Sequence, residues 1–399
     1  MNNKLTYKKT ILISIEGQIH FIDEIINNFY KDYDVIIDEW GKNKNFDTRE
    51  IMLNQANYIF CEWCSNNATW YSNNKKPEQK LIIRLHRWEL YSRHFFQINW
   101  DNVDKIIFIS PHIQNEAIYR YSHYFTLNEY NFDKHYYLSN NEEFFTKNEN
   151  IQNEWTHFNN FIKKNSGRVP NFKILGTKSD LIDEEFKNKT IFIPNYIKKS
   201  IFTNIEKNAD CEYNLGLVGY IPKLKRADIA VEILNYLVKI NSKYKLFIIG
   251  KQIKDVPWLK KNKLELNYID NLNNLIKKYK LEKNVFFENY NTNIGMWFKK
   301  IGYILGTSDI EGSHHSLAEG MRCGTIPLIY GGALKKYRLD LIYPSKFCFF
   351  DDNITNLCKN ILELNNNNNQ RLQYVLECVC YSSTNFDFNK ICNQVKELI

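Results

Sequence analysis

Two glutamates, Glu311 and Glu319, flank the segment in which chemically capable side chains are most concentrated. The segment reads Gly306-Thr-Ser-Asp-Ile-Glu-Gly-Ser-His-His-Ser-Leu-Ala-Glu319. An apolar run before it predicts a strand, and the residues after the turn predict a helix. The free N–H groups and the dipole of a helix N-terminus favour an anion such as a diphosphate. Two carboxylates beside that anion could accept hydrogen bonds from sugar or ribose hydroxyls. The candidate binding residues of the turn are Gly312, Ser313 and His314.

A basic loop follows the predicted strand 213–218. It begins with a glycine bend, and its candidate residues are Gly219, Tyr220, Lys225 and Arg226. Fixed lysine and arginine charges there could neutralise the phosphates of a bound nucleotide sugar. The competing interpretation is a basic turn on the surface.

His86 ends the apolar run 81–85 in the N-terminal half. Ligands of open α/β sheets bind outside the carboxyl ends of the strands, so His86 is a candidate site residue. A structural histidine with its hydrogen bonds satisfied is the alternative. For Glu319 taken alone, the alternative is a glutamate on a solvated helix face.

Positioning these residues requires strands and helices that alternate, and this rhythm occurs twice along the chain. Short β-branched runs separated by helical patterns indicate a parallel sheet with crossover helices, so the expected class is α/β with two Rossmann-like domains. The first set comprises strands at 11–15, 34–37, 58–61, 81–85 and 106–110, a helix at 19–30, and a last strand in the segment 191–197 that is ended by Pro194. The second comprises strands at 213–218, 245–249, 285–287, 303–306 and 326–328, and a helix at 227–239.

Two domains are expected, 1–197 and 198–380. An aromatic-rich, mostly helical insertion is predicted at 119–189. Its function is open between packing on the first domain and contact with an acceptor or a membrane. A C-terminal helix is expected in 381–399. The asparagine tract 365–369 is predicted to be a surface loop between helices.

Composition excludes several classes of protein. A hydrophobic fraction of 44% in 399 residues supports a large core, which excludes a disordered chain. The net charge of +8 is scattered over short pairs, so no nucleic-acid partner is expected. No apolar run reaches the roughly 18 residues of a membrane helix, and no signal peptide is evident, so a cytoplasmic protein is expected.

The nine cysteines are odd in number and irregularly spaced, which favours reduced thiols. Cys61-Glu-Trp-Cys64 has no partner pair at ligand spacing, so no metal site is expected.

With these motifs in place, the sequence resembles the GT-B glycosyltransferases, specifically retaining family 4 (glycosyl transferases group 1). The Glu311-to-Glu319 spacing resembles the donor motif of that family, and 320–327 resembles its small-residue turn and proline. The loop 218–228 resembles its diphosphate loop, and 193–195 resembles the strand end before its hinge. The resemblance covers both domains outside the insertion. It implies that 1–197 is the acceptor side, that 198–380 binds the donor, and that the C-terminal helix in 381–399 packs back on the first domain.

The resemblance implies a role for each candidate residue. Glu311 would contact the transferred sugar, Glu319 the nucleotide ribose and Lys225 the diphosphate, and His86 matches the active-site histidine near the reacting sugar. Backbone amides of 312–314 would complete the donor site. Where the family generally has an arginine, this chain has Tyr220. Residues that could replace that cation are Lys223 and Arg226.

The implied activity is metal-independent transfer of a hexosyl or N-acetylhexosaminyl group, with retention, from a UDP- or GDP-linked sugar and without a cofactor. The expected acceptor is a glycan or a polyprenyl-linked glycan in bacterial surface polysaccharide synthesis, such as capsule or lipopolysaccharide. Peripheral contact with the inner membrane is a further hypothesis. Two alternatives stay open: other GT-B chemistry, namely an inverting transferase or a nucleotide-sugar epimerase, and a non-catalytic sugar-nucleotide-binding module.

Overall fold

The structure is a computed structural model of the chain. It describes residues 8–42, 45–92, 94–125, 182–202, 206–219, 222–251, 256, 262–290, 293–309, 311–331 and 338–399. Most of the predicted insertion, 126–181, lies outside the described residues, and so does Tyr220. The flanks of the insertion are described and are helical. They belong to α5 (Pro111–Phe125) and α7 (Glu184–Lys189).

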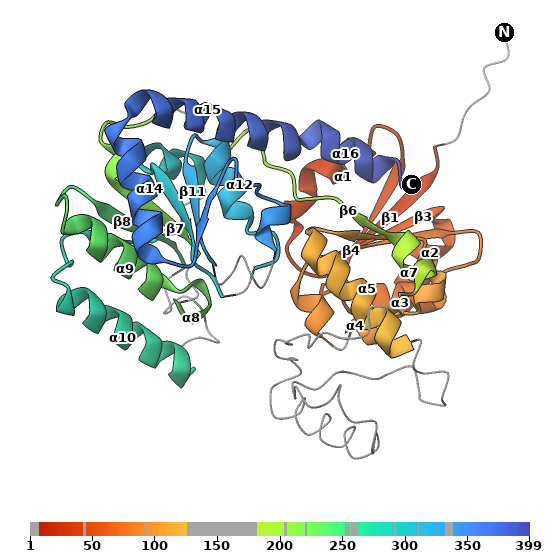
Figure 1. Cartoon of the computed structure of the whole chain (residues 1–399). Coiled ribbons are helices and arrows are strands. Elements are labelled where there is room, and N and C mark those ends of the chain that lie inside the picture. The colour runs from red at the N-terminus through yellow and green to blue at the C-terminus, as the bar shows by residue number, and fades with distance from the viewer. Residues whose placement is uncertain are drawn as a thin grey trace, which may run out of the picture. The chain divides into compact units, whose positions relative to one another are not determined.

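The chain divides into two compact units. The first comprises residues 1–194 together with 392–399, and the second comprises 195–391. Each unit contains one parallel sheet of six strands, which confirms the predicted α/β class with two Rossmann-like sheets. Figure 1 shows the two sheets with their covering helices.

The sheet of the first unit has the strand order β2-β1-β3-β4-β5-β6, and every neighbouring pair is parallel. Its strands are β1 (Thr10–Ile15), β2 (Asp34–Glu39), β3 (Tyr58–Glu62), β4 (Lys80–Leu85), β5 (Lys105–Phe108) and β6 (Thr190–Phe192). The helices are α1 (Asp23–Phe29), α2 (Phe46–Gln55), α3 (Asn66–Asn74), α4 (His94–Gln97), α5 and α7, with α16 (Phe388–Lys396) ending in this unit. The inner strands β1, β3, β4 and β5 are buried almost throughout, so they read as nearly continuous apolar runs. The edge strands β2 and β6 are only partly buried.

The sheet of the second unit has the order β12-β11-β10-β7-β8-β9 and is also parallel. Its strands are β7 (Asn214–Val218), β8 (Lys245–Gly250), β9 (Val285–Asn289), β10 (Tyr303–Gly306), β11 (Ile326–Tyr330) and β12 (Phe349–Asp351). Its helices are α8 (Pro222–Lys225), α9 (Ala227–Val238), α10 (Lys263–Lys278), α11 (Ile294–Trp297), α12 (His315–Arg322), α14 (Ile354–Asn366) and α15 (Asn368–Asn385).

Alternate side chains of β10 pack into two separate hydrophobic cores in the second unit. Tyr303 and Leu305 pack in a cluster with α9, α10 and α14, whereas Ile304 packs in a cluster with α11, α12 and α15. Side chains of a strand alternate between the two faces of its sheet, so helices cover both faces. This layering fixes the strand ends, from which the candidate loops emerge.

Two local predictions, one of a helix and one of a loop, differ from the structure. The helix expected at 19–30 is interrupted at Ile22, whose φ of −135° is not helical, and α1 begins afresh at Asp23. The last strand of the first sheet ends at Phe192, just before Pro194, so the prediction that this proline ends the strand is confirmed. Proline has no N–H to continue the pairing.

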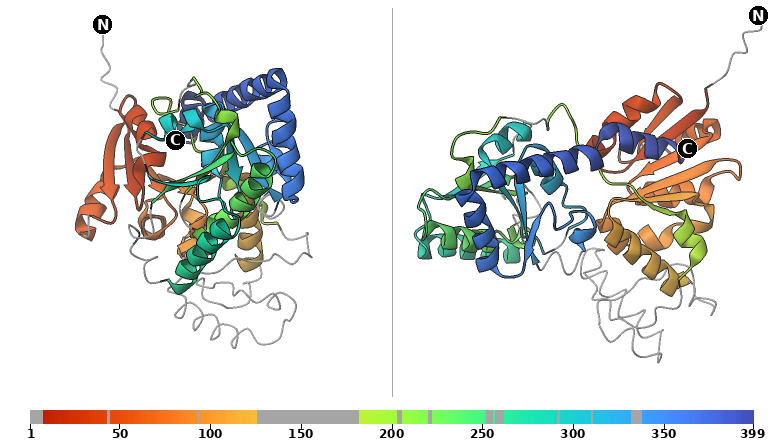
Figure 2. Two further views of the ribbon diagram at one scale, coloured as in Figure 1. Left: turned by 90° about the vertical axis from the view of Figure 1, so that its left-hand side faces the viewer. Right: turned by 45° about the horizontal axis from the view of Figure 1, so that its top comes forward.

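The asparagine tract 365–369 is mostly helical and is not a loop. Only Asn367 separates α14 from α15, which meet at a sharp corner (Figures 1 and 2). The Asn367 side chain accepts a hydrogen bond from the Gln370 amide, so it caps the second helix. The asparagine tract therefore provides the N-cap of α15 and does not form a linker.

A buried charge pair holds the first unit together near β2. Asp38 is fully buried, and its Oδ2 accepts hydrogen bonds from Ser14 Oγ at 3.1 Å, Tyr71 Oη at 3.0 Å and Arg49 Nε at 3.4 Å. Arg49 is also buried, 2% exposed. A buried pair of this kind is costly to break, because removing one partner leaves the other charge unpaired.

We expect Asp38→Asn to lower the free energy of unfolding of the first unit by about 3–5 kcal/mol, because Arg49 loses its carboxylate. Urea titration followed by tryptophan fluorescence measures this. Glu39→Gln is the matched control on the same strand: Glu39 is half exposed and pairs with the exposed Lys42, so its removal should cost less than about 1 kcal/mol. Equal losses in the two variants would contradict the structural role of Asp38.

Candidate functional site

Lys225 and Glu311 form an ion pair at the carboxyl ends of β7 and β10. Lys225 Nζ lies 2.6 Å from Glu311 Oε1, and the side chains are 18% and 12% exposed, respectively. Lys225 ends the short helix after β7, and Glu311 lies in the turn after β10. The two predicted motifs, far apart in the sequence, therefore meet because their strands are parallel neighbours.

Backbone contacts join the two loops that carry this pair. Thr307 Oγ1 donates to the Lys225 carbonyl at 2.7 Å, and the Asp309 amide donates to the Leu224 carbonyl at 2.9 Å. Gly219 has a φ of +101°, and a Cβ at this position would lie 2.9 Å from Lys225 Cε. Glycine is required there both by the backbone conformation and by the space that the lysine side chain fills.

The surroundings of Glu311 strongly favour its ionised carboxylate form. Burial alone would raise its pKa, but the cationic forms of His314 and Lys225 more than offset burial and bring the pKa to about 2. Burial lowers the pKa of His314 to about 4, so this imidazole is neutral at pH 7. Lys225 is therefore the cation that balances Glu311 at neutral pH.

The turn before α12 places the helix N-terminus beside this pair. His314 is the N-cap, with a left-handed φ of +48°, and its ring is buried with Nε2 3.8 Å from Glu311 Oε1. Tyr343 Oη donates to the carbonyls of Ser313 and His314 at 2.9 and 3.1 Å. Gly312 lies between Glu311 and the buried Ser313, partly exposed. The opening N–H groups of α12 have no partner within the helix and can bind an anion.

Glu319 lies further along α12 and has a different electrostatic environment. Burial raises the pKa of Glu319 to about 7, and its Oε1 lies 3.8 Å from His315 Nε2. Its side chain keeps 19% of its surface exposed, so it is not sealed in the core. Glu311 and Glu319 are thus carboxylates with opposite protonation preferences on one short segment.

Arg226, a candidate for phosphate binding, is engaged by carboxylates. Its guanidinium bonds Asp228 through Nε at 3.0 Å and Asp309 through Nη1 at 2.9 Å. The residue has a left-handed φ of +49° and is the N-cap of α9. Lys225 and Arg226 are adjacent in sequence, yet only Lys225 pairs with Glu311. Tyr220 lies outside the described residues.

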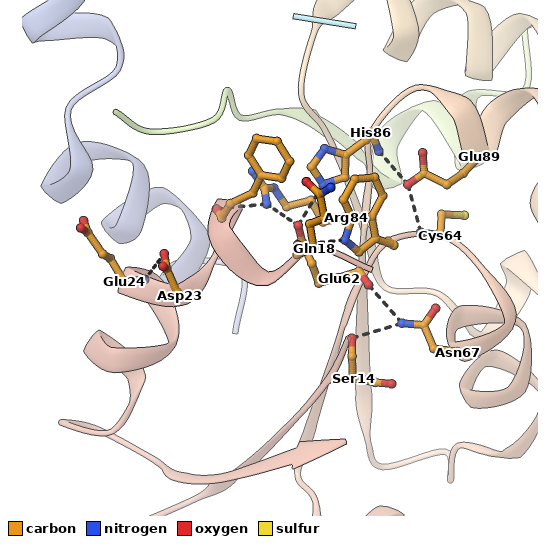
Figure 3. A network of polar contacts seen from close by, with 12 residues as sticks. Ser14, Gln18, Asp23, Glu24, Glu62, Cys64, Asn67, Arg84, His86 and Glu89 are labelled. Atoms are coloured by element: carbon orange, nitrogen blue, oxygen red, sulfur yellow. Dashed lines mark hydrogen bonds and ion pairs between the residues drawn. The ribbon is translucent and has the colours of Figure 1, made fainter. Parts of the chain in front are cut away.

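His86 lies in the first unit, directly after β4, and is 5% exposed. Its Nε2 is 2.9 Å from Glu62 Oε1, and the same oxygen accepts from Arg84 Nη1 at 2.8 Å. Figure 3 shows this network at the ends of β3 and β4. Sequence reasoning singled out His86 but missed its partners.

The missed residues are Glu62, Trp63, Arg84 and Glu89. One signal was available: Arg84 interrupts an otherwise apolar buried strand, and a charge in such a place requires a buried counter-charge. Glu62 lies inside the Cys61–Cys64 segment, in which the two thiols are the more conspicuous groups. Burial raises the pKa of both Cys61 and Cys64 well above the usual value, so neither is a reactive thiolate at neutral pH.

The described residues contain neither a metal-binding cluster nor a membrane-spanning helix. In these parts of the chain, no group of three or more His, Cys, Asp or Glu side chains is arranged to hold a metal ion. Of the described helices, none is both long enough and apolar enough to span a membrane.

No family model matches the sequence. The chain is 25% identical over 212 residues to the poly(ribitol-phosphate) α-N-acetylglucosaminyltransferase of Staphylococcus aureus (strain COL). The alignment covers 52% of this chain and 39% of that protein, so the chain spans well under half of the relative.

Solved structures resemble the chain over most of its length. HepE from Anabaena, solved with UDP and glucose, has a TM-score of 0.61 at 12% identity, covering 98% of this chain and 99% of HepE. Sucrose-phosphate synthase from Thermosynechococcus elongatus has a TM-score of 0.57 at 11% identity, covering 98% of both chains. TarM from S. aureus, solved with UDP, has a TM-score of 0.52 at 15% identity, covering 86% of this chain and 55% of TarM.

These likenesses, together with the two parallel sheets, define the fold class: the chain has the GT-B fold. The sequence relative and the structural neighbours are glycosyltransferases. The resemblance inferred from the motifs is confirmed at the level of GT-B.

The raised pKa of Glu319 generates a prediction about pH. The pKa is about 7 in the folded protein against an ordinary value of 4.5, so folding disfavours the ionised form. The stability of the second unit should therefore fall through this group as pH rises from about 4.5 to about 7. Glu319→Gln removes this loss and should stabilise the unit at pH 8 by about 1–3 kcal/mol, with no gain at pH 4.5.

Urea titrations of the wild-type protein and of Glu319→Gln at these two pH values give the difference. Glu282→Gln is the control, since Glu282 is exposed and lies outside the site. A gain that is the same at both pH values would contradict the assignment.

Proposed function

We propose that this chain is a retaining glycosyltransferase that transfers a sugar from a nucleotide sugar to a glycan or lipid-linked acceptor. The observation that carries the proposal is the Lys225–Glu311 pair beside the N-terminus of α12, with Glu319 on the same helix. A cation and a helix N-terminus suit a diphosphate, and two nearby carboxylates suit hydroxyl groups. Relatives with this fold include HepE and TarM, both solved with UDP. Family 4 and a UDP- or GDP-linked donor are part of the proposal.

In the proposed reaction, the bond between the anomeric carbon and the diphosphate oxygen breaks. Negative charge then develops on the leaving diphosphate, while the sugar acquires oxocarbenium character. Lys225 and the amides of 312–314 stabilise that charge electrostatically, so the proposed transfer needs no metal ion. Glu311 contacts the transferred sugar, Glu319 accepts hydrogen bonds from the ribose, and His86 contacts the reacting sugar.

Retention is proposed to follow from attack on the face that the diphosphate leaves. The acceptor oxygen forms its bond to the anomeric carbon there, and a phosphate oxygen of the leaving group takes the acceptor proton. No protein nucleophile takes part in this scheme. The scheme makes the diphosphate both leaving group and base, so its position at Lys225 controls both steps.

The acceptor is proposed to be a bacterial surface glycan or its polyprenyl-linked precursor. The S. aureus relative is named for poly(ribitol phosphate) and transfers N-acetylglucosamine by its name, which supports a surface polymer as the class. The proposal places the protein in the cytoplasm with peripheral contact at the inner membrane. The net charge of +8 supports that contact. Flotation with anionic vesicles at low salt tests it, and absence of the protein from the vesicle fraction would contradict it.

A panel of nucleotide sugars in EDTA tests the donor site. One donor should raise the melting temperature and should be slowly hydrolysed to a nucleoside diphosphate, because a ligand that binds only the folded state stabilises it. Lys225→Ala should weaken donor binding about 10- to 100-fold, since a charge-assisted contact contributes about 1.5–3 kcal/mol. Glu311→Ala should remove hydrolysis. Isothermal titration and release of nucleoside diphosphate measure both effects.

Lys243→Ala is the matched control, because Lys243 is in the same unit and its exposed side chain pairs only loosely with Asp210 at 3.6 Å. It should bind donor like the wild-type protein. If no nucleotide or nucleotide sugar shifts the melting curve, the donor site is wrong. The anomeric configuration of the product, read by proton NMR, tests retention separately: an inverted product would exclude the retaining mechanism and leave the donor site intact.

A further inference from the structure

Glu62 and Arg84 face each other across two neighbouring strands, and His86 joins them. In the parallel pair β3–β4, Glu62 is the register partner of Arg84. Residues two apart on a strand point to the same face, so His86, just beyond the end of β4, follows Arg84 toward the same carboxylate. Glu62 Oε1 accepts from Arg84 at 2.8 Å and lies 2.9 Å from His86 Nε2. Glu62 is fully buried.

The protonation state of this pair fixes the hydrogen on the imidazole. Burial would raise the pKa of Glu62, but Arg84 and His86 more than offset burial, and the net shift is downward. Glu62 is therefore ionised and can only accept hydrogen bonds, so His86 Nε2 must carry a proton. Burial lowers the pKa of His86, which keeps the ring neutral at neutral pH. In a neutral imidazole the other nitrogen, Nδ1, is then an acceptor.

Nδ1 is the ring nitrogen that remains for a ligand. In the described parts of the chain, His86 Nδ1 has no hydrogen-bond partner, and it is not among the sealed polar atoms that lack one. The charged groups that face the ring are Glu62, Arg84 and His20. Among the described residues, the hydrogen bond of the ring is thus made by Nε2, to Glu62.

Trp63 fixes the plane of the imidazole. Its ring stacks on His86 with centroids 3.9 Å apart and an interplanar angle of 21°. The tryptophan has a left-handed φ of +72°, a costly conformation for a bulky residue. Its Nε1 donates to the Gln18 carbonyl at 3.2 Å, and Gly17 leaves room for the ring, because a Cβ there would lie 2.9 Å from Nε1. The strained backbone of Trp63 therefore holds its ring against His86, where the stacking restricts rotation of the imidazole.

Glu89 fixes the backbone that carries the histidine. Its Oε1 accepts from the amides of His86 and Cys64 at 3.1 and 3.3 Å, joining the segments that follow β4 and β3. Glu89 is fully buried. The imidazole is therefore held at its backbone, at its face and at one ring nitrogen, as Figure 3 shows for the polar contacts.

We infer that Glu62 is a positioning residue, which holds His86 as the Nε2–H tautomer and presents Nδ1 as a hydrogen-bond acceptor to the substrate. The group bound at His86 must then be a donor, such as a hydroxyl, and not an unprotonated phosphate or carboxylate oxygen. That the hydroxyl belongs to a sugar rests on the proposed function. The tautomer and the role of Glu62 do not depend on it.

Nitrogen-15 NMR of histidine-labelled wild-type protein tests the tautomer without any activity. His86→Gln identifies the His86 signals by their loss among the nine histidines. We expect one tautomer at pH 8, with a protonated Nε2, an unprotonated Nδ1 and an Nε2–H proton that exchanges slowly with solvent. A protonated Nδ1 on a neutral ring, or fast averaging of the two tautomers, would overturn the inference.

Variants test the role of Glu62. Glu62→Gln leaves Arg84 buried without a carboxylate and could fail to fold, so Glu62→Leu combined with Arg84→Met removes both charges together, a change that buried ion pairs often tolerate. We expect this double variant to lose the protected Nε2–H signal and to lower the pKa of His86 further, because the neighbouring anion is gone. The kcat should fall about 10- to 100-fold, with a smaller change in donor affinity.

Asp38→Asn is the matched control, because Asp38 is another fully buried carboxylate of the same sheet that pairs with an arginine and does not contact His86. It should lower stability yet leave the His86 signals unchanged. A double variant with wild-type tautomer, pKa and kcat would overturn the inference. The expected NMR signature in a protein that transfers no sugar would support the positioning of His86 and contradict the proposed function instead.

Discussion

The parallel direction of every strand in each sheet is the constraint on which both candidate sites depend. A parallel sheet covered by helices on both faces has apolar side chains along most of each strand, so polar chemistry collects where the strands end. The ends of β7 and β10 bring Lys225 to Glu311, and those of β3 and β4 bring Glu62 to His86. In both cases residues distant in sequence become neighbours because their strands are parallel neighbours.

Three ion pairs in the molecule differ in how much of their side chains is exposed, and this difference separates pairs that stabilise the fold from a pair that a ligand can contact. The pairs Arg49–Asp38 and Arg84–Glu62 are almost completely buried, with side chains at most 2% exposed. Lys225–Glu311 keeps more than a tenth of each side chain exposed. A ligand can contact an ion pair only where part of the pair is exposed. A fully buried pair can influence a ligand only through a neighbouring residue. Glu62 has that neighbour in His86, and Asp38 has none among the described histidines.

The sequence was sufficient for the α/β class, most strand positions and the two loops that carry Lys225 and Glu311, because apolar runs and glycine turns are local signals. Prediction from the sequence was wrong where one segment carries signals for two different structures. Ile22 breaks an apolar helical pattern, and the asparagine tract looks like a loop although Asn367 caps a helix. The partners of His86 were missed for another reason: a buried counter-charge is a property of strand register, which no single segment encodes.

Glu311 and Glu319 show why spacing alone could not assign their chemistry. Both are glutamates of one turn-and-helix segment, yet the pKa is about 2 for Glu311 and about 7 for Glu319. The difference arises because the cationic form of His314 and the charge of Lys225 together offset burial at Glu311, whereas burial acts alone on Glu319. Glu311 is thus a permanent acceptor and anion. Glu319 near neutral pH can accept or donate a hydrogen bond, and a vicinal diol, which offers both donors and acceptors, matches that dual capacity.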